Sequence, residues 1–204
     1  MAYHGCRYTG GHSMADLDLC YTPATELAAR IRDRKLSPVE LMKNALARIE
    51  TVNPKLNCFC FVYPEEALAM ARAAEQAVTD GRALGPLHGI PIAIKDLTPT
   101  KGKRTTLGSY THENWVPDRN AVIVDRLEAA GAIMVGKTTT PEFAYSSFTE
   151  SPLWGVTRNP WNLARNTAGS SSGAGAGIVA GYGPLALGTD IGGSVRLPAA
   201  YNGI

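Results

Sequence analysis

Residues 164–204, ARNTAGSSSGAGAGIVAGYGPLALGTDIGGSVRLPAAYNGI, constrain the fold more than any other stretch of the chain. Serine clusters set among glycines lie at 170–172 and 192–194. Glycine–serine runs are typical of flexible linkers. Here, however, the run carries apolar anchors that a linker does not need: Ile178, Val179, Leu185, Leu187, Val195 and Leu197. We therefore expect a packed site whose glycines let backbone N–H groups approach a ligand, as a serine nucleophile and an oxyanion hole require.

Composition limits the classes of partner. The chain has 204 residues, of which 45% are hydrophobic and 19% charged, as in one globular domain. Its net charge of +2 is too small to favour nucleic acid or an anionic membrane surface. No apolar run is long enough to span a membrane. We expect neither nucleic acid nor membrane as a partner.

The cysteines and the N-terminal residues indicate a cytoplasmic protein. Residues 1–21 lack the apolar core of a signal peptide and are expected to be a disordered extension. Four cysteines fit a reducing compartment better than a disulfide scaffold. Cys58 and Cys60 alternate with phenylalanines, which predicts buried free thiols. Because no His or Cys spacing matches a metal site, we expect neither metal nor cofactor.

Helices alternate with short apolar strands, which predicts an α/β fold. A proline after Thr22 opens one helix, and Ser37 with Glu40 forms the capping box of the next. Asn53-Pro54 is expected to end that second helix. Later helices are expected at 65–79 and from Asn120 to Ala130, the last with Ile123, Leu127 and Ala130 on its packed side. Strands are expected at 57–62, 92–94, 132–135 and 185–187.

Residues 131–138, GAIMVGKT, match the phosphate-binding pattern G-x-x-x-x-G-K-[ST]. That pattern needs a glycine-rich loop, whereas the four variable residues here form the expected strand. Lys137 would leave the end of this strand. Nucleotide binding is therefore a distant alternative.

Residues 169–173 match the nucleophile-elbow pattern G-x-S-x-G, with Ser171 at its centre. An elbow needs a preceding strand, but residues 161–167 are polar and suggest irregular structure. It also needs a later histidine, and all four histidines lie upstream. The Ser-His-Asp interpretation is therefore disfavoured, unless its partners lie beyond residue 204.

Lysine is the remaining candidate base for a serine. Lys95 directly follows the apolar residues 92–94, and burial would lower its pKa and favour the neutral amine. Successive N–H groups from Ile191 to Ser194 could converge on one oxygen. Taken alone, these residues leave two non-catalytic alternatives open. Lys95 could extend its amine to the surface, and residues 191–194 could be a glycine turn beside a helix cap.

Several segments taken together resemble the amidase signature family. They are LHGIPIAIKD around Lys95, GKTTTPEF at 136–143, NPWN at 159–162, and GSSSGAGAG followed by PLALGTDIGGSVRLPAAYNG. The spacing of Lys95, Ser170 and Ser194 also agrees with that family. The resemblance extends from Thr22 to the last residue.

The resemblance implies a mixed β-sheet flanked by helices and a Ser-cisSer-Lys triad. By it, Ser194 is the acyl-forming nucleophile, Ser170 the bridging serine after a cis peptide bond, and Lys95 the base. The remaining roles, also implied, are an oxyanion hole lined by the backbone of Ile191, Gly192 and Gly193, and a substrate-binding segment with Tyr145 and Ser146. The reaction would be hydrolysis of a small-molecule amide through an acyl-enzyme.

The chain departs from the family at two places. Ala168 and Ser172 stand where glycines are usual, and both are small-for-small changes. Family members are about twice as long, so 22–204 would be the N-terminal portion of a truncated amidase domain. Two alternatives follow: the amidase subunit of a glutamyl-tRNA amidotransferase, which needs partner subunits, and an inactive fragment acting only in binding. A homodimer is a further option.

Overall fold

The computed structural model describes residues 15–204. Residues 1–14 of the expected extension 1–21 lie outside the described part. The end of that extension is helical rather than disordered, since α1 spans Leu17–Tyr21. Asp16 caps this helix by accepting hydrogen bonds from the N–H groups of the first turn. Helical structure is therefore present before Thr22.

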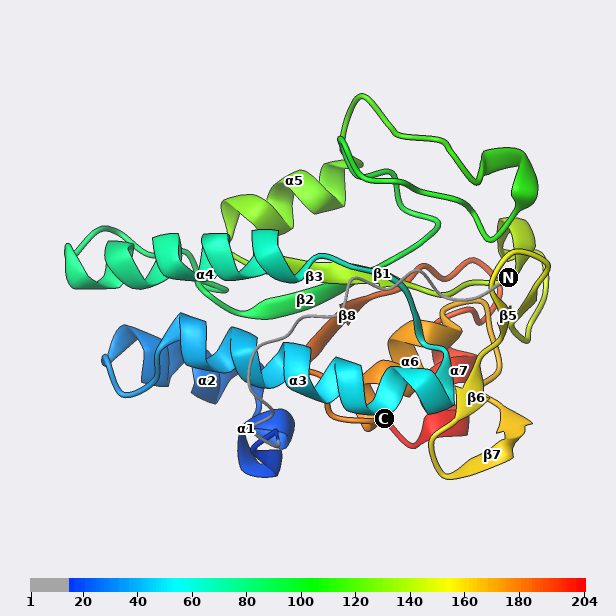
Figure 1. The fold of residues 1–204 in the computed structure, drawn as a ribbon, viewed down its shortest axis with the longest axis horizontal. Helices are drawn as coiled ribbons and strands as arrows, with labels where there is room; N and C mark the ends of the chain where they lie inside the picture. The colour runs from blue at the N-terminus through cyan, green and yellow to red at the C-terminus, as the bar shows by residue number, and fades with distance from the viewer. Residues whose placement is uncertain (1–14) are drawn as a thin grey trace.

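The centre of the fold is a mixed four-stranded sheet in the order β1-β3-β2-β8 (Figure 1). β1 runs antiparallel to β3, whereas β3, β2 and β8 are mutually parallel. The strands span Phe59–Val62 (β1), Pro91–Lys95 (β2), Ile133–Thr138 (β3) and Leu185–Leu187 (β8). The predicted α/β class and mixed sheet are confirmed.

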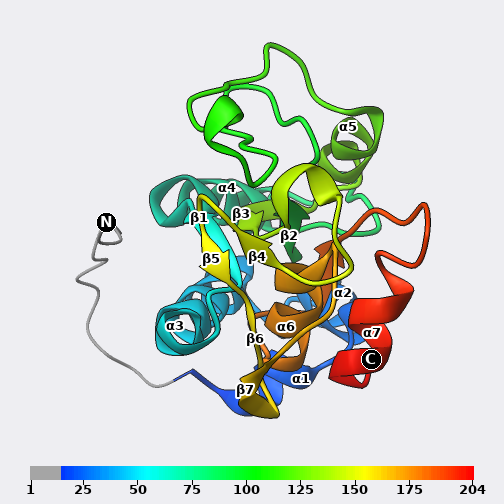
Figure 2. The same cartoon turned by 90° about the vertical axis from the view of Figure 1, so that its right-hand side faces the viewer.

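Helices cover both faces of the sheet (Figures 1 and 2). α5 lies on one side, and α3 and α6 lie on the other, with α4 beside α3. The helices are α2 (Ala24–Arg32), α3 (Pro38–Leu56), α4 (Pro64–Thr79), α5 (Val122–Ala129), α6 (Ser172–Val179) and α7 (Arg196–Asn202), with 3-10 turns η1 (Tyr110–His112) and η2 (Glu142–Ala144).

Alternation along β2 decides which way its functional residues point. Ile92 and Ile94 pack with Val124 of α5. Ala93 instead belongs to the larger core on the other face, which includes residues of α3 and α6. Because side chains alternate along a strand, Lys95 points to the α6 side, like Ala93.

Two predicted helix boundaries are wrong because asparagine side chains bond elsewhere. Asn53-Pro54 does not end α3, which continues to Leu56. The Asn53 amide instead accepts hydrogen bonds from the N–H groups of Cys58 and Phe59, and ties the helix to β1. Asn120 does not cap α5, whose N-cap is Ala121.

The expected packed side of α5 is only partly right. Asn120 donates to Asp125 and, through the same amide, to Glu128 on the solvent side. In this helix Val124 is buried and Ile123 is exposed, while Leu127 packs on the core. The expected helix face containing Ile123 is therefore wrong at that residue.

Two short hairpins lie outside the sheet. β4 (Glu150–Ser151) pairs with β5 (Gly155–Val156), and β6 (Arg158–Asn159) pairs with β7 (Asn162–Asn166). The expected irregular segment 161–167 is therefore largely a strand. It escaped prediction because β7 is exposed along its whole length and so carries no apolar alternation.

Lys137 does not leave the end of a strand. It lies inside β3 and is fully buried. Residues 131–138 therefore form a turn and a strand rather than the glycine-rich loop that phosphate binding requires. The predicted buried free thiols Cys58 and Cys60 are confirmed.

Helix α6 approaches the sheet through backbone rather than side chains. A Cβ atom added at Gly173 would lie 2.5 Å from the N atom of Thr139 and closer still to the O atom of Cys58. Real Cβ atoms do not make such contacts with backbone. Only glycine allows α6 to lie this near the strand ends.

We expect Gly173→Ala to lower the free energy of unfolding by about 1–3 kcal/mol, as overpacking a rigid core does. Urea unfolding monitored by circular dichroism measures this. Gly183→Ala is the matched control, because its Cβ would be 3.6 Å from Pro91, an ordinary contact. Equal stability of the two variants would contradict the close approach of α6.

Candidate active site

Lys95 and Ser170 meet at the end of the central strand. Lys95 is the last residue of β2 and is fully buried. Its Nζ lies 2.6 Å from Ser170 Oγ and 2.9 Å from Thr189 Oγ1. Burial lowers the pKa of Lys95 to about 7, and attraction to Asp190 opposes this in part. The amine can therefore be neutral near neutral pH and accept a proton from the serine.

The segment before α6 sets the position of Ser170. The peptide bond between Gly169 and Ser170 is cis, as the resemblance implied. The three serines 170–172 are buried. A Cβ at Gly169 would lie 3.0 Å from Phe148 N and 3.1 Å from Ser146 O. The loop 146–148 therefore packs directly against the peptide that carries the bridging serine.

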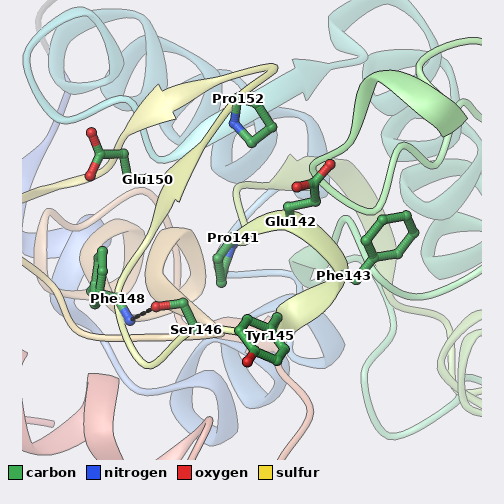
Figure 3. Close-up of a pocket in the computed structure, with 8 residues that line it drawn as sticks. All are labelled: Pro141, Glu142, Phe143, Tyr145, Ser146, Phe148, Glu150 and Pro152. Atoms are coloured by element: carbon green, nitrogen blue, oxygen red, sulfur yellow. Dashed lines mark hydrogen bonds between the residues drawn. The ribbon is translucent and has the colours of Figure 1, made fainter.

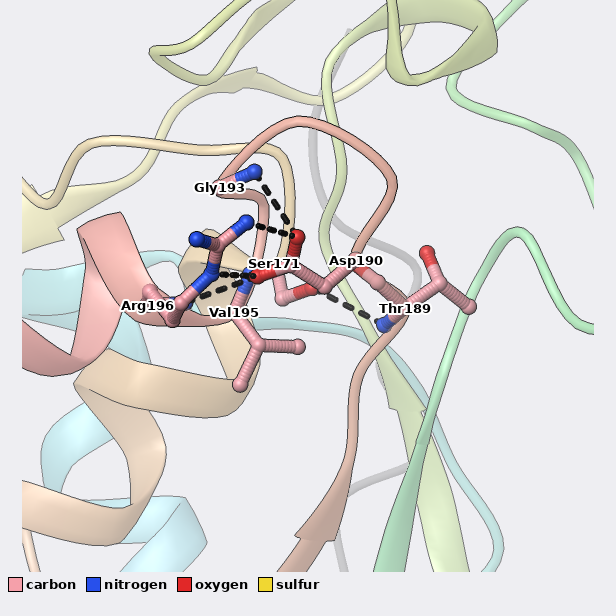
Figure 4. A network of polar contacts seen from close by, with 6 residues as sticks. All are labelled: Ser171, Thr189, Asp190, Gly193, Val195 and Arg196. Carbon is pink, nitrogen blue, oxygen red and sulfur yellow. Dashed lines mark hydrogen bonds and ion pairs between the residues drawn. The ribbon is translucent and has the colours of Figure 1, made fainter.

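Asp190 organises the loop that contains the second serine cluster (Figure 4). Its carboxylate accepts from the N–H groups of Gly193 (2.7 Å), Val195 (2.9 Å) and Arg196 (3.1 Å). The Arg196 guanidinium also donates, through Nε (3.1 Å) and Nη2 (2.9 Å). These donors, the guanidinium first, hold the pKa of Asp190 well below its ordinary value. The loop is thus closed around one carboxylate.

Three hydrogen bonds join this loop to the first serine cluster, and one of them is donated by Ser171 Oγ to the carbonyl oxygen of Thr189 at 3.3 Å. The N–H of Ser171 donates to the carbonyl oxygen of Ser194 at 3.0 Å. The N–H of Thr189 donates to Ser171 Oγ at 3.2 Å. The residue after Ser170 is therefore bonded to the backbone of Ser194. No described residue hydrogen-bonds the side chain of Ser194, whose role as nucleophile stays a prediction.

The predicted oxyanion donors differ in availability. The N–H of Gly193 is occupied by Asp190. Ile191 and Gly192 are exposed, and within the described residues their N–H groups have no hydrogen-bond acceptor. In this conformation Ile191 and Gly192 are the better candidates.

A hollow of about 410 Å³ lies over the segment that contacts Gly169 (Figure 3). It includes both residues predicted to bind substrate: Tyr145, 95% exposed, and Ser146, whose Oγ accepts from Phe148 N at 3.3 Å. The lining residues are Pro141, Glu142, Phe143, Tyr145, Ser146, Phe148, Glu150 and Pro152. A role in substrate binding stays a prediction.

Other kinds of site find no support in residues 15–204. Among them, no group of three or more His, Cys, Asp or Glu could hold a metal ion. In the same range, no helix is both long and apolar enough to cross a membrane.

Sequence reasoning missed Thr189 and the pair of Asp190 with Arg196. The signal was available, since a threonine and an aspartate come just before the glycines and an arginine follows Ser194. Periodicity cannot tell which backbone N–H groups a carboxylate will gather, so only the folded loop identifies these residues.

The sequence profile of the Amidase family matches residues 40–204. The chain belongs to the amidase signature family. A glutamyl-tRNA(Gln) amidotransferase subunit from Acidothermus cellulolyticus is 45% identical over 187 residues, which cover 92% of this chain and 37% of that protein. The chain therefore spans somewhat over a third of the length of this relative.

Solved amidase structures share the fold. A fatty acid amide hydrolase superposes with a TM-score of 0.88 at 34% identity, covering 91% of this chain and 33% of that one. A peptide amidase from Stenotrophomonas maltophilia gives a TM-score of 0.86 at 33% identity, covering 92% and 40%. The described residues thus form the part of the amidase fold that contains Lys95, Ser170 and Ser194.

Burial of Lys95 predicts a pH dependence of stability. Its amine holds a proton only below about pH 7 in the folded chain, against about 10.5 for an exposed lysine. Between these values the unfolded chain binds more protons, so this group makes the free energy of unfolding rise with pH. We expect the rise between pH 6 and 10 to be steeper in the parent than in Lys95→Met. Urea titrations of both proteins measure it, and parallel profiles would contradict a depressed pKa.

The Asp190 network predicts a rigid loop. We expect Asp190→Asn to speed amide hydrogen exchange at Gly193 and Val195 by roughly tenfold or more, because an amide accepts fewer of these donors and carries no charge. NMR exchange measurements test this, with exposed Asp118→Asn as the control. Unchanged exchange at both amides would show that Asp190 does not hold the loop.

Proposed function

We propose that this part of the amidase fold hydrolyses a carboxylic amide to an acid and ammonia or an amine. The observation that carries the proposal is the buried hydrogen bond between Lys95 Nζ and Ser170 Oγ. A buried, neutral amine bonded to a serine is a general base. The family membership of the chain supports the same chemistry.

In the proposed reaction, neutral Lys95 takes a proton from Ser170 while Ser170 takes one from Ser194. The Ser194 oxygen attacks the amide carbonyl. The N–H groups of Ile191 and Gly192 stabilise the oxyanion, at about 2.7–4 kcal/mol per donor. The proton passes back through Ser170 to the leaving nitrogen, and the C–N bond breaks. Water then hydrolyses the Ser194 ester by the same relay.

The substrate would be a small molecule whose acyl part lies over the hollow. Tyr145 and Phe148 offer aromatic surface there. The backbone of residues 146–148 lies against Gly169, which directly precedes Ser170. Cytoplasmic location is part of the proposal, since Cys20, Cys58 and Cys60 are free thiols.

A second candidate function is that of the amidase component of a glutamyl-tRNA(Gln) amidotransferase. The 45% identity to the Acidothermus cellulolyticus protein favours it. In that case the ammonia released would be passed on to a further reaction, and partner subunits would be needed. Glutaminase activity that appears only with the other amidotransferase subunits would favour this function over free-standing hydrolysis.

We expect a fluorophosphonate to phosphonylate the chain once, at Ser194 Oγ, with loss of fluoride. Intact-mass spectrometry of the parent should show one adduct, and Ser194→Ala none. Lys95→Ala and Ser170→Ala should slow labelling by about 10²-fold or more, since each removes part of the base relay. Exposed Thr79→Ala, at the end of α4, is the control and should label like the parent.

Each outcome decides between the alternatives. No adduct on a parent chain that circular dichroism shows to be folded would mean that this part alone is inactive. Full labelling of Lys95→Ala would contradict a lysine base.

A further inference from the structure

Asp96 lies on the side of β2 opposite to Lys95. It directly follows Lys95 and is fully buried. Its carboxylate accepts from the N–H of Thr106, at 3.1 and 3.2 Å, and from the hydroxyl of Thr106. The backbone N–H of Asp96 donates to Thr138 O at 2.9 Å, and its carbonyl oxygen accepts from the N–H of Leu107 at 3.0 Å. Asp96 thus clamps one end of the loop 98–109 to the sheet.

Lys137 bonds to both ends of the same loop. It pairs with Ile94 on neighbouring β2, so it points to the α5 side, as Asp96 does. Its Nζ donates to Thr98 O at 2.7 Å, Thr100 Oγ at 3.0 Å and Thr105 Oγ at 3.1 Å. All three ammonium hydrogens are therefore used by one loop.

The two charges support each other in the interior. Burial lowers the pKa of Lys137 to about 8 and raises the pKa of Asp96. Attraction between the two groups opposes both shifts. Two buried charges of this kind are not strong stabilisers, because apolar side chains of the same size often stabilise as well. What the pair provides here is a fixed geometry for the loop.

The loop in turn bonds to the segment 141–154, which contains the residues that line the hollow. Thr106 Oγ accepts from the indole Nε1 of Trp154 at 2.9 Å. Phe143 N donates to Leu107 O at 2.7 Å, and Ser151 Oγ donates to Gly108 O at 2.7 Å. The segment 141–154, which lines the hollow, is therefore attached to the loop at three points.

We propose that Asp96 and Lys137 are positioning residues that fix the hollow relative to Lys95. The end of β2 would then hold both parts of the site in place. The Lys95 amine and Ser170 lie on one side of the strand, and the loop and the hollow lie on the other. This inference rests on the proposed function only for the effect of these residues on substrate binding. The attachment of the segment 141–154 to the loop 98–109 can be tested without enzymatic activity.

The first test reads the attachment through the indole N–H of Trp154 in the ¹⁵N-labelled chain. The chain has three tryptophans, and Trp154→Phe assigns the signal. We expect Thr106→Val to move the Trp154 signal upfield by removing its acceptor. Asp96→Asn and Lys137→Met should also move it, although neither residue touches the indole, while the Trp161 signal stays. Exposed Thr111→Val is the matched control and should leave the Trp154 signal in place.

The second test reads the effect on substrate. Propionamide has a short acyl part, whereas the phenyl ring of 4-phenylbutyramide would extend over the hollow in the proposed binding mode. We expect Asp96→Asn and Thr106→Val to raise KM for the longer amide by about tenfold or more, with kcat/KM for propionamide kept within about twofold. An equal loss on both amides would overturn the proposal, because Asp96 would then act on Lys95 itself.

The two readouts separate the inference from the proposed function. If the folded parent hydrolyses neither amide, the proposed function fails for this chain and the indole signal decides the attachment. An unmoved Trp154 signal in folded Asp96→Asn and Lys137→Met would overturn it. If Asp96→Asn does not fold, Thr106→Val and Lys137→Met carry both tests, since both keep the Asp96 carboxylate.

Discussion

Taking the amine of Lys95 out of water is the constraint on which the rest of the site depends. Removal from water opposes the charged form of a lysine and so favours the form that can act as a base. It requires a strand between two others, here β3 and β8, with helices on both faces. It also requires hydroxyl partners, which Ser170 and Thr189 supply from two distant segments.

The same sheet uses a second buried lysine for a different purpose. Lys95 has two hydroxyl partners, whereas Lys137 gives all its hydrogens to one loop. The two side chains leave neighbouring strands toward opposite faces. A lysine of depressed pKa can thus serve as a candidate base or as a fixed anchor, and its partners distinguish the two roles.

Much of the fold could be predicted from local patterns, and the exceptions share a cause. The strands at 92–94 and 185–187 are short apolar runs, and Ser37 caps α3 as its capping box predicts. The helix boundaries predicted at Asn53 and Asn120 are wrong because the amides of these residues bond to residues outside the expected turn. A side chain that can stop a helix can also tie it to another segment, and periodicity does not distinguish the two cases.

The candidate site divides in a similar way. The burial of Lys95 follows from an apolar strand, but its pairing with Ser170 came from the family resemblance. The roles of Asp96 and Lys137 escaped prediction, because the sequence does not show that threonines of the loop 98–109 will bond to both side chains. Only the parallel pairing of β2 with β3 brings them to one face.

Helix α6 has a consequence for how such a chain can diversify. From Ser172 to Gly177 it buries only serine, glycine and alanine, so it offers no side chain that could be exchanged for a differently shaped one. New binding preferences would have to arise in the surrounding loops, such as 141–154, while the residues of the helix stay the same. The part of the molecule closest to the proposed chemistry is thus the part least able to vary.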